Sequence, residues 1–319
     1  MPQPVLFCSA TAWECSADEW GTVAPGLVPV LLQPGVRVAD SDIARIDVGF
    51  LSADLWPYQS SNFMKVATRA MNLRWFHTAS AGVDHPVFGS LLERGVRLTT
   101  SSGASATPIA HTVIMYLLAM SRNLPGFIDG QRRQHWEQRT VGDLEGRTLG
   151  VIGMGPIGTE VARLAKEFGM RVIAMRRTPS GDEPCETWTL DRLHDLLPVV
   201  DDLVLAVPLA DGTRGLIGAA ELAALPSGSR LVNVGRGELV DESALVAALR
   251  SGHVGAAALD VFTVEPLPTD SPLWAMPNVI ITPHSSGTTA LSTQRAVMRF
   301  TDNLRRYISG DDLVNEVLR

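Results

Sequence analysis

Cysteine is scarce in this chain, with three among 319 residues. Cys8, Cys15 and Cys185 show no metal-ligand spacing, and an odd number argues against a disulfide framework. We therefore interpret them as structural thiols in a reducing compartment.

Long apolar runs are also missing. Stretches such as residues 113–120 are far too short to span a bilayer. The first residues lack the charged and apolar segments of a signal peptide. These absences predict a cytoplasmic protein with no membrane partner.

Positive charge is in deficit, since 27 Lys and Arg face 34 Asp and Glu for a formal net charge of −7. A net negative surface offers no electrostatic footprint for nucleic acid, so nucleic acid is not an expected partner. No two histidines stand four residues apart with a third ligand nearby, so we predict no metal site. The length suits two domains better than one compact core.

Short apolar segments alternate with helical segments in two series, a pattern typical of parallel α/β sheets. The first series places strands at Val5–Cys8, Val28–Leu32, Val48–Leu51, Arg74–Thr78 and Arg97–Thr99. A long apolar helix follows over Ser105–Met120, and its few charges indicate burial between layers or domains. The second series places strands at Thr148–Ile152, Arg171–Met175, Asp202–Val207, Arg230–Asn233, Ala256–Leu259 and Val279–Thr282.

The last segment, Thr288 to Ile308, reads as a helix that lies beyond the second sheet and can return to the first domain. We therefore expect one domain from residues 1–102 and 285–319, wrapped around a second from residues 103–284. The predicted fold class is α/β, with two Rossmann-like or flavodoxin-like domains, parallel sheets and a cleft between them.

The strongest local signal is a glycine-rich turn over residues 153–158, between an apolar strand and an amphipathic helix. Gly153 permits a tight turn, Gly155 lets the backbone approach a pyrophosphate, and Gly158 lets the helix pack close to the sheet. The helix N-terminus presents free N–H groups to the anion. This context predicts a dinucleotide site whose contacts are Gly153, Gly155, Pro156, Ile157 and Gly158.

The residues after the second strand of this series bear on the choice of cofactor. An NAD site usually has an acidic side chain about 20 residues after the glycines. Here Arg176, Arg177 and Thr178 occupy that stretch, and guanidinium groups pair well with a 2′-phosphate. The sequence favours NADP(H) and leaves NAD(H) possible, because these arginines would also suit a solvated loop.

Three chemically capable side chains follow predicted strands of the second series: Arg236, Glu265 and His284. In an open α/β sheet, ligands bind outside the carboxyl ends of the strands, so the three can converge there. A carboxylate beside a histidine stabilises the imidazolium, which can donate a proton to a carbonyl oxygen. Arg236 can bind a carboxylate or carbonyl with paired donors. Taken singly, each also has an ordinary structural role.

These motifs together resemble the D-isomer-specific 2-hydroxyacid dehydrogenase family, which includes glyoxylate/hydroxypyruvate reductases. The resemblance covers nearly the whole chain and rests on residues 153–158, 231–241, 258–268 and 282–284. It implies an oxidoreductase that transfers a hydride between NAD(P)H and a small 2-keto or 2-hydroxy acid. It implies Arg236, Glu265 and His284 as the catalytic set, with His284 as general acid and base.

The resemblance also implies roles for other positions. The backbone of Ala81, Gly82 and Val83, together with Arg236, would hold the substrate carboxylate. Asp260 would contact the nicotinamide carboxamide region. Further cofactor contacts would come from Val207, Pro208, Thr213, Val234 and Gly235. Most members are dimers joined through their nucleotide domains, and the stretch Gly126–Gln138 resembles the region that reaches the partner. Trp136 would lie near the partner's site, or it would be an ordinary interface or core tryptophan.

One departure from the family pattern is His111, where the family usually has glutamate. This difference puts in doubt whether the family's substrate preference applies to this sequence. Candidates for side-chain selectivity are Leu51, Trp56, Tyr58, His77 and the partner's Trp136. An alternative function is a dinucleotide-sensing binding protein of the corepressor type, which fold alone does not exclude. A relative that acts on formate or phosphite is a third interpretation, although Thr282-Pro283-His284 does not match the formate pattern.

Overall fold

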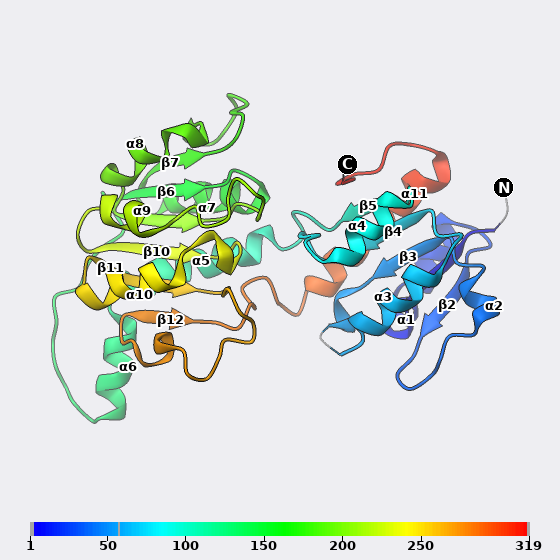
Figure 1. The fold of residues 1–319 in the computed structure, drawn as a ribbon, viewed down its shortest axis with the longest axis horizontal. Helices are drawn as coiled ribbons and strands as arrows, with labels where there is room; N and C mark the ends of the chain where they lie inside the picture. Colours follow the sequence, from blue (N-terminus) through cyan, green and yellow to red (C-terminus); the bar gives the residue numbers. More distant parts are fainter. Residues whose placement is uncertain (1–2, 57, 318–319) are drawn as a thin grey trace. The chain divides into compact units, whose positions relative to one another are not determined.

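The computed structural model describes residues 3–56 and 58–317. The chain divides into two compact units (Figure 1). Unit 1 runs to Ser105 and resumes at Thr289, and unit 2 comprises Ala106 to Thr288. Each unit has its own parallel sheet and its own hydrophobic cores.

Unit 1 is built on a five-stranded parallel sheet in the order β2-β1-β3-β4-β5. The strands are β1 (Val5–Ser9), β2 (Val28–Leu32), β3 (Val48–Leu51), β4 (Trp75–Thr78) and β5 (Arg97–Thr100). The helices are α1 (Ala10–Val23), α2 (Asp40–Ile43), α3 (Ser60–Arg69), α4 (Pro86–Glu93) and α11 (Ser292–Ser309). This strand order is the flavodoxin-like one.

Alternate side chains of these strands face opposite layers, as the two-residue period of a strand requires. Phe7 packs in a core with Phe63 of α3 and Phe88 of α4, whereas its neighbour Leu6 belongs to a core with Trp20 of α1. Both faces are therefore covered, which explains why these strands read as continuous apolar runs.

The C-terminal helix α11 completes the second of these cores. Phe300 stacks on Phe50 and Trp75, with ring centroids 4.4 and 5.2 Å away. The indole nitrogen of Trp20 donates a hydrogen bond of 2.9 Å to the Thr301 hydroxyl. The predicted return of this helix to the first sheet is confirmed.

Unit 2 contains a seven-stranded parallel sheet in the order β12-β11-β10-β9-β6-β7-β8. The strands are β6 (Thr148–Ile152), β7 (Arg171–Met175), β8 (Glu186–Trp188), β9 (Asp202–Leu205), β10 (Ser229–Asn233), β11 (Val254–Leu259) and β12 (Val279–Ile281). The order reverses between β6 and β9. Such a switch point is where open α/β sheets bind their ligands, beyond the carboxyl ends of the strands.

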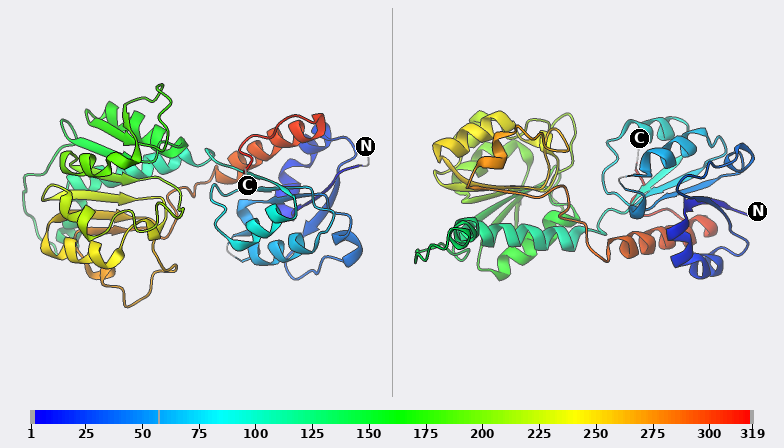
Figure 2. Two further views of the ribbon diagram at one scale, coloured as in Figure 1. Left: turned by 45° about the horizontal axis from the view of Figure 1, so that its top comes forward. Right: turned by 90° about the horizontal axis from the view of Figure 1, so that it is seen from below.

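Two helices, α5 (Ala106–Ser121) and α7 (Pro156–Glu167), cover one face of this sheet, and α6 (Leu124–Arg132) follows α5 along the chain. The other face carries α8 (Leu193–Leu196), α9 (Ala219–Ala224) and α10 (Glu242–Ser251). Figure 2 shows α5 lying along its face of the sheet. Burial of this apolar helix against the sheet matches its lack of charge.

The parallel α/β fold class and all eleven predicted strands are confirmed, with ends that differ by at most two residues. The edge strand β8 was missed, because its three residues carry no apolar run. Within residues 3–56 and 58–317, no helix combines the length and hydropathy needed to cross a membrane.

Candidate active site

The glycine-rich turn follows β6 at the switch point of the sheet in unit 2. Gly153 has φ of +104°, a conformation that side chains rarely adopt, and an added Cβ would lie 2.6 Å from the carbonyl oxygen of Ala206. At Gly158 an added Cβ would lie 1.8 Å from the carbonyl oxygen of Gly153. These two glycines are therefore required by the fold of the turn itself.

Gly155 differs from both. It is the N-cap of α7 with φ of −76°, which any residue adopts, and within the described chain an added Cβ would meet no atom closer than 4 Å. The fold alone thus does not require glycine here. The open space lies at the N-terminus of a helix that begins with Pro156, where N–H groups favour an anion. This surface fits the pyrophosphate of a dinucleotide.

The segment after β7 carries the residues expected to select the cofactor. Arg176 donates to the carboxylate of Glu183 at 2.9 Å and to the Ser180 hydroxyl at 3.1 Å. The backbone N–H groups of Ser180 and Gly181 also donate to Glu183, at 2.6 and 2.8 Å. These hydrogen bonds, the one from Ser180 first, lower the pKa of Glu183 to about 2. Glu183 therefore stays ionised and holds Arg176.

The next two residues of this segment are different. Arg177 and Thr178 are exposed, and in the described part of the chain no ion pair to Arg177 is found. Glu183 follows Arg176 by seven residues, and the turn at Ser180 and Gly181 brings its carboxylate back to the Arg176 guanidinium.

The segment after β9 is held by Thr213. Its buried hydroxyl donates to the Pro208 carbonyl at 2.9 Å and accepts from the N–H of Ala210 at 2.8 Å. Val207 lies against the glycine turn, since its nitrogen is 2.8 Å from the position of a Cβ on Gly153. Thr213 therefore shapes the loop that borders the proposed dinucleotide site.

The segment after β10 carries Arg236. The side chain of Val234 lies in the core, and the N–H of Gly235 donates to Asn233 Oδ1 at 3.0 Å. Any cofactor contact from these two residues would therefore come from their remaining backbone groups. The half-buried Arg236 donates to the carbonyl of Gly235 at 2.8 Å.

Gly237 joins this segment to the one that carries Glu265. An added Cβ on Gly237 would lie 1.9 Å from the carbonyl carbon of Phe262. The N–H of Phe262 in turn donates to Glu265 Oε1 at 2.9 Å. The loops of Arg236 and Glu265 therefore pack against each other at the carboxyl edge of neighbouring strands.

Glu265 and His284 form a direct pair, with 2.8 Å between Glu265 Oε2 and His284 Nδ1. Because the other carboxylate oxygen is fixed by backbone, the carboxylate has a set direction, and Nδ1 is the ring nitrogen that it holds. The exposed fractions are 51% for His284 and 35% for Glu265, so solvent still reaches the pair. This arrangement leaves Nε2 for proton exchange.

The backbone of His284 is strained. Its φ is +50°, in the left-handed region, which costs a non-glycine residue about 1–3 kcal/mol and persists only where the surroundings fix it. Its N–H donates to the carbonyl of Asp260 at 2.8 Å and approaches that of Thr282 at 3.1 Å. Strain of this kind often gathers at functional sites.

The buried Asp260 carboxylate is occupied by the same loop. It accepts from the Thr282 hydroxyl at 2.5 Å, from the N–H of Ser285 at 2.9 Å and from the N–H of Ser286 at 3.1 Å, and the Ser286 hydroxyl also donates to it. A carboxylate offers about four lone-pair sites. The resemblance assigns Asp260 to the nicotinamide, but in this structure its oxygens bind the loop that carries His284.

The proposed carboxylate-binding loop lies in unit 1, after β4. The Ser80 hydroxyl donates to the carbonyl of Gly82 at 2.8 Å, and the N–H of Ser101 donates to the Ser80 carbonyl at 3.2 Å. Ala81 is exposed, and no acceptor for the N–H groups of residues 81–83 is found among the described residues. These groups are thus available to an anion.

Two of the candidates for side-chain selectivity are wrong. Leu51 and His77 are both 0% exposed and belong to the interior of unit 1. Their strands are covered on both faces, and β-strand alternation alone does not reveal this. Trp56, Tyr58 and Trp136 are 48%, 88% and 93% exposed, so these three remain available, and a core position for Trp136 is excluded.

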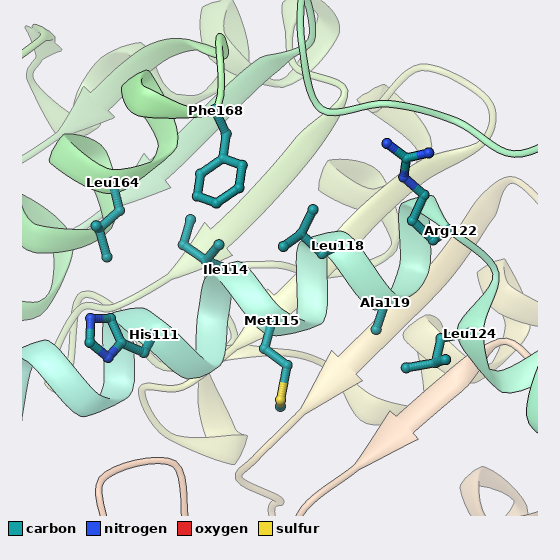
Figure 3. Close-up of a pocket in the computed structure, with 9 residues that line it drawn as sticks. All are labelled: His111, Ile114, Met115, Leu118, Ala119, Arg122, Leu124, Leu164 and Phe168. Atoms are coloured by element: carbon teal, nitrogen blue, oxygen red, sulfur yellow. The ribbon is translucent and has the colours of Figure 1, made fainter.

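Unit 2 also has an apolar hollow of about 520 Å³ on the outer side of α5 and α7. Figure 3 shows Leu164 and Phe168 facing Ile114 and Leu118 of α5, with the exposed His111 at one end. None of the residues that line it belongs to the segments described above.

The described residues hold no group of three metal-ligating side chains.

Comparison with known proteins identifies the chain's relatives. Residues 114–286 match the model of the D-isomer specific 2-hydroxyacid dehydrogenase NAD binding domain. The glyoxylate reductase of Aeropyrum pernix is 36% identical over 253 residues, 76% of each chain. The D-3-phosphoglycerate dehydrogenase of Methanocaldococcus jannaschii is 34% identical over 256 residues, which are 79% of this chain and 49% of that protein. The chain thus matches about half the length of that relative.

A solved structure agrees over almost the whole length. The D-isomer specific 2-hydroxyacid dehydrogenase from Xanthobacter autotrophicus Py2, in complex with NADPH and MES, has a TM-score of 0.82 and 32% identity, covering 99% of this chain and 98% of that one. The resemblance inferred from the motifs is confirmed. This chain belongs to the D-isomer specific 2-hydroxyacid dehydrogenase family and is an NAD(P)-dependent 2-hydroxyacid dehydrogenase.

Proposed function

We propose that this protein reduces a small 2-keto acid of the glyoxylate or hydroxypyruvate kind, with His284 as the general acid and NADPH as the preferred cofactor. The observation that carries the proposal is the Glu265–His284 pair, with 2.8 Å between Oε2 and Nδ1 and the carboxylate anchored by backbone. A relative named glyoxylate reductase supports the choice of substrate class.

The bound nicotinamide would supply the hydride for the carbonyl carbon. As the carbonyl oxygen gains charge, His284 donates its Nε2 proton to it, and Glu265 stabilises the imidazolium that makes this donation possible. Arg236 offers paired donors to the substrate carboxylate or to the carbonyl oxygen. The N–H groups of Ala81 to Val83 are proposed to bind the substrate carboxylate. In the oxidative direction the neutral imidazole accepts the proton.

The residues of unit 2 also fit the dinucleotide. Gly155 and the N-terminus of α7 would take the pyrophosphate, and Val207, Pro208 and the loop held by Thr213 would border the adenosine half. Arg177 and Thr178 would take the 2′-phosphate. Because Arg176 is paired with Glu183, we infer that Arg177 contributes the larger share of the attraction to this phosphate.

The catalytic part is tested with His284→Gln, assayed by loss of the reduced cofactor's absorbance with glyoxylate, hydroxypyruvate, pyruvate and phenylpyruvate. We expect kcat to fall by about 10²–10⁴ with the fold retained. His253→Gln serves as the matched control, because His253 lies away from the proposed site, with its Nε2 3.1 Å from the Leu222 carbonyl oxygen. Wild-type turnover in His284→Gln would reject the assignment.

The cofactor part is tested by comparing NADPH with NADH in three proteins. In Arg177→Ala we expect the KM for NADPH to rise about tenfold and the KM for NADH to change little. The rise should be smaller in Arg176→Ala. A wild-type protein that prefers NADH would reject the role of Arg177 while leaving the oxidoreductase assignment intact.

The proposed assembly is a homodimer formed through unit 2, in the cytoplasm. Its support is apolar surface on that unit: Met115, Leu124 and Phe168 around the hollow are 52%, 46% and 41% exposed. Contiguous exposed apolar surface of this kind marks contact sites. The 93% exposed Trp136, in the segment after α6, would be covered in the same assembly.

A further inference from the structure

Helix α5 carries a buried tyrosine hydroxyl on the side that packs against the sheet of unit 2. Tyr116 is 0% exposed and packs among aliphatic side chains against the sheet of unit 2. A buried tyrosine hydroxyl needs a hydrogen-bond partner. This hydroxyl finds one at the end of β12, because it bonds to the hydroxyl of Thr282, two residues before His284.

The direction of this hydrogen bond follows from counting protons. A threonine hydroxyl has one hydrogen, and Thr282 donates it to Asp260 Oδ1 at 2.5 Å. Tyr116 must therefore be the donor to Thr282. The series of hydrogen bonds runs from the Tyr116 O–H to the Thr282 hydroxyl and on to the Asp260 carboxylate. Burial, and then the negative charge of Asp260, raise the pKa of Tyr116 to about 12, so its proton stays in place.

This series of hydrogen bonds ends at the loop that carries His284. The Asp260 carboxylate accepts from the N–H groups of Ser285 and Ser286, and the Asp260 carbonyl accepts from the N–H of His284. These bonds flank a residue whose φ is +50°. A backbone in this region keeps its conformation only when several contacts fix it at once. Hydrogen bonds in such a network strengthen one another.

We propose that Tyr116 is a positioning residue for His284. Tyr116 acts through the Thr282 hydroxyl and the Asp260 carboxylate, and so fixes the loop 282–286. The proposal rests on the proposed role of His284 for its catalytic consequence, but the anchoring of the loop does not depend on that role. Tyr116 itself touches neither His284 nor Glu265 through any bond found in the described chain.

The first test measures the loop directly, without turnover. Tyr116→Phe removes only the hydroxyl, and hydrogen–deuterium exchange of a peptide spanning residues 282–288 should become about tenfold faster. Tyr307→Phe is the control, since Tyr307 is a half-buried tyrosine of unit 1 and should leave this peptide unchanged. Unchanged exchange in Tyr116→Phe would overturn the proposal whatever the protein's activity.

The second test measures the catalytic consequence. In single turnovers with enzyme in excess, Tyr116→Phe should slow hydride transfer about three- to tenfold, while cofactor affinity stays within about twofold. A partly misfolded sample lowers the amplitude of this reaction but not its rate constant. A lower rate constant therefore distinguishes a positioning role for Tyr116 from a merely structural one. Thr282→Ser keeps the hydroxyl and should retain the wild-type rate, whereas Thr282→Val should be at least as slow as Tyr116→Phe.

The double variant completes the argument. If Tyr116 acts through Thr282, Tyr116→Phe in a Thr282→Val background should not slow hydride transfer further, because the hydrogen bond between the two residues is already absent. Additive losses, or a wild-type rate constant in Tyr116→Phe, would overturn the proposal. A wild-type protein without keto-acid turnover, or full turnover in His284→Gln, would instead reject the proposed function and leave the exchange result to decide the anchoring.

Discussion

His77 should make the stability of this protein fall in mildly acidic solution. Its ring lies in unit 1 with Nδ1 2.7 Å from the Thr99 hydroxyl and Nε2 3.0 Å from the Ser101 hydroxyl. Neither partner carries charge, and the surrounding rings are Phe50, Trp75 and Phe300. Burial lowers the pKa of His77 from 6.5 to about 3, so the folded protein keeps it neutral.

The sign and size follow from this shift. Below pH 6.5 the unfolded chain protonates His77 and the folded chain does not, so stability is full above pH 6.5 and is lost as the pH falls towards 3. Each pH unit in that window is worth about 1.36 kcal/mol. Between pH 7 and pH 5 the free energy of unfolding should therefore decrease by about 2 kcal/mol through this residue alone.

The measurement is urea unfolding at both pH values for the wild type and for His77→Gln, which keeps hydrogen-bonding groups but does not titrate. All other titrating groups are common to both proteins, so the difference between their pH dependences isolates His77. His194→Gln, at a histidine whose side chain is 70% exposed, is the control and should follow the wild type. Parallel curves for the wild type and His77→Gln would refute the reasoning.

Three other changes separate folding from binding and assembly. Gly155→Ala should leave the melting temperature nearly unchanged but weaken dinucleotide binding about tenfold in a fluorescence titration. Gly158→Ala should instead lower the melting temperature, because its Cβ would lie 1.8 Å from a carbonyl oxygen. Equal melting temperatures for the two variants would contradict this reasoning. Asp202→Asn should lower the free energy of unfolding in urea by about 3–5 kcal/mol, because the 0% exposed carboxylate binds Arg147 and Arg230. The kcat should be retained, since this pair lies at the end of the sheet opposite His284. A decrease in the free energy of unfolding of less than about 1 kcal/mol would contradict the prediction. Met115→Lys should shift the protein from dimer to monomer in light scattering, and an unchanged mass would exclude this face as the interface.

The sequence was sufficient for the secondary structure of both sheets because their strands are buried on both faces. Continuous apolar runs such as residues 149–152 stand out from their polar surroundings, and the glycines at positions 153 and 158 are demanded by local backbone geometry. The three residues of β8 escaped detection, since an edge strand with half-exposed side chains has no such run.

The order of the motifs along the chain was also sufficient for the family. Arg236, Glu265 and His284 each follow a strand, and parallel strands bring their carboxyl ends to one edge. The contact between Glu265 and His284 was therefore foreseeable in kind, but its 2.8 Å geometry and the backbone anchor at Phe262 came only from the structure.

Long-range pairing is what the sequence did not reveal. We expected His77 to line a pocket, but both faces of its strand are covered and its side chain is 0% exposed. Nothing in the pattern of α5 shows that the Tyr116 hydroxyl meets Thr282, which is 166 residues away. Local periodicity and turn chemistry are written in neighbouring residues, whereas the partner of a buried polar group is decided by how helix and sheet pack.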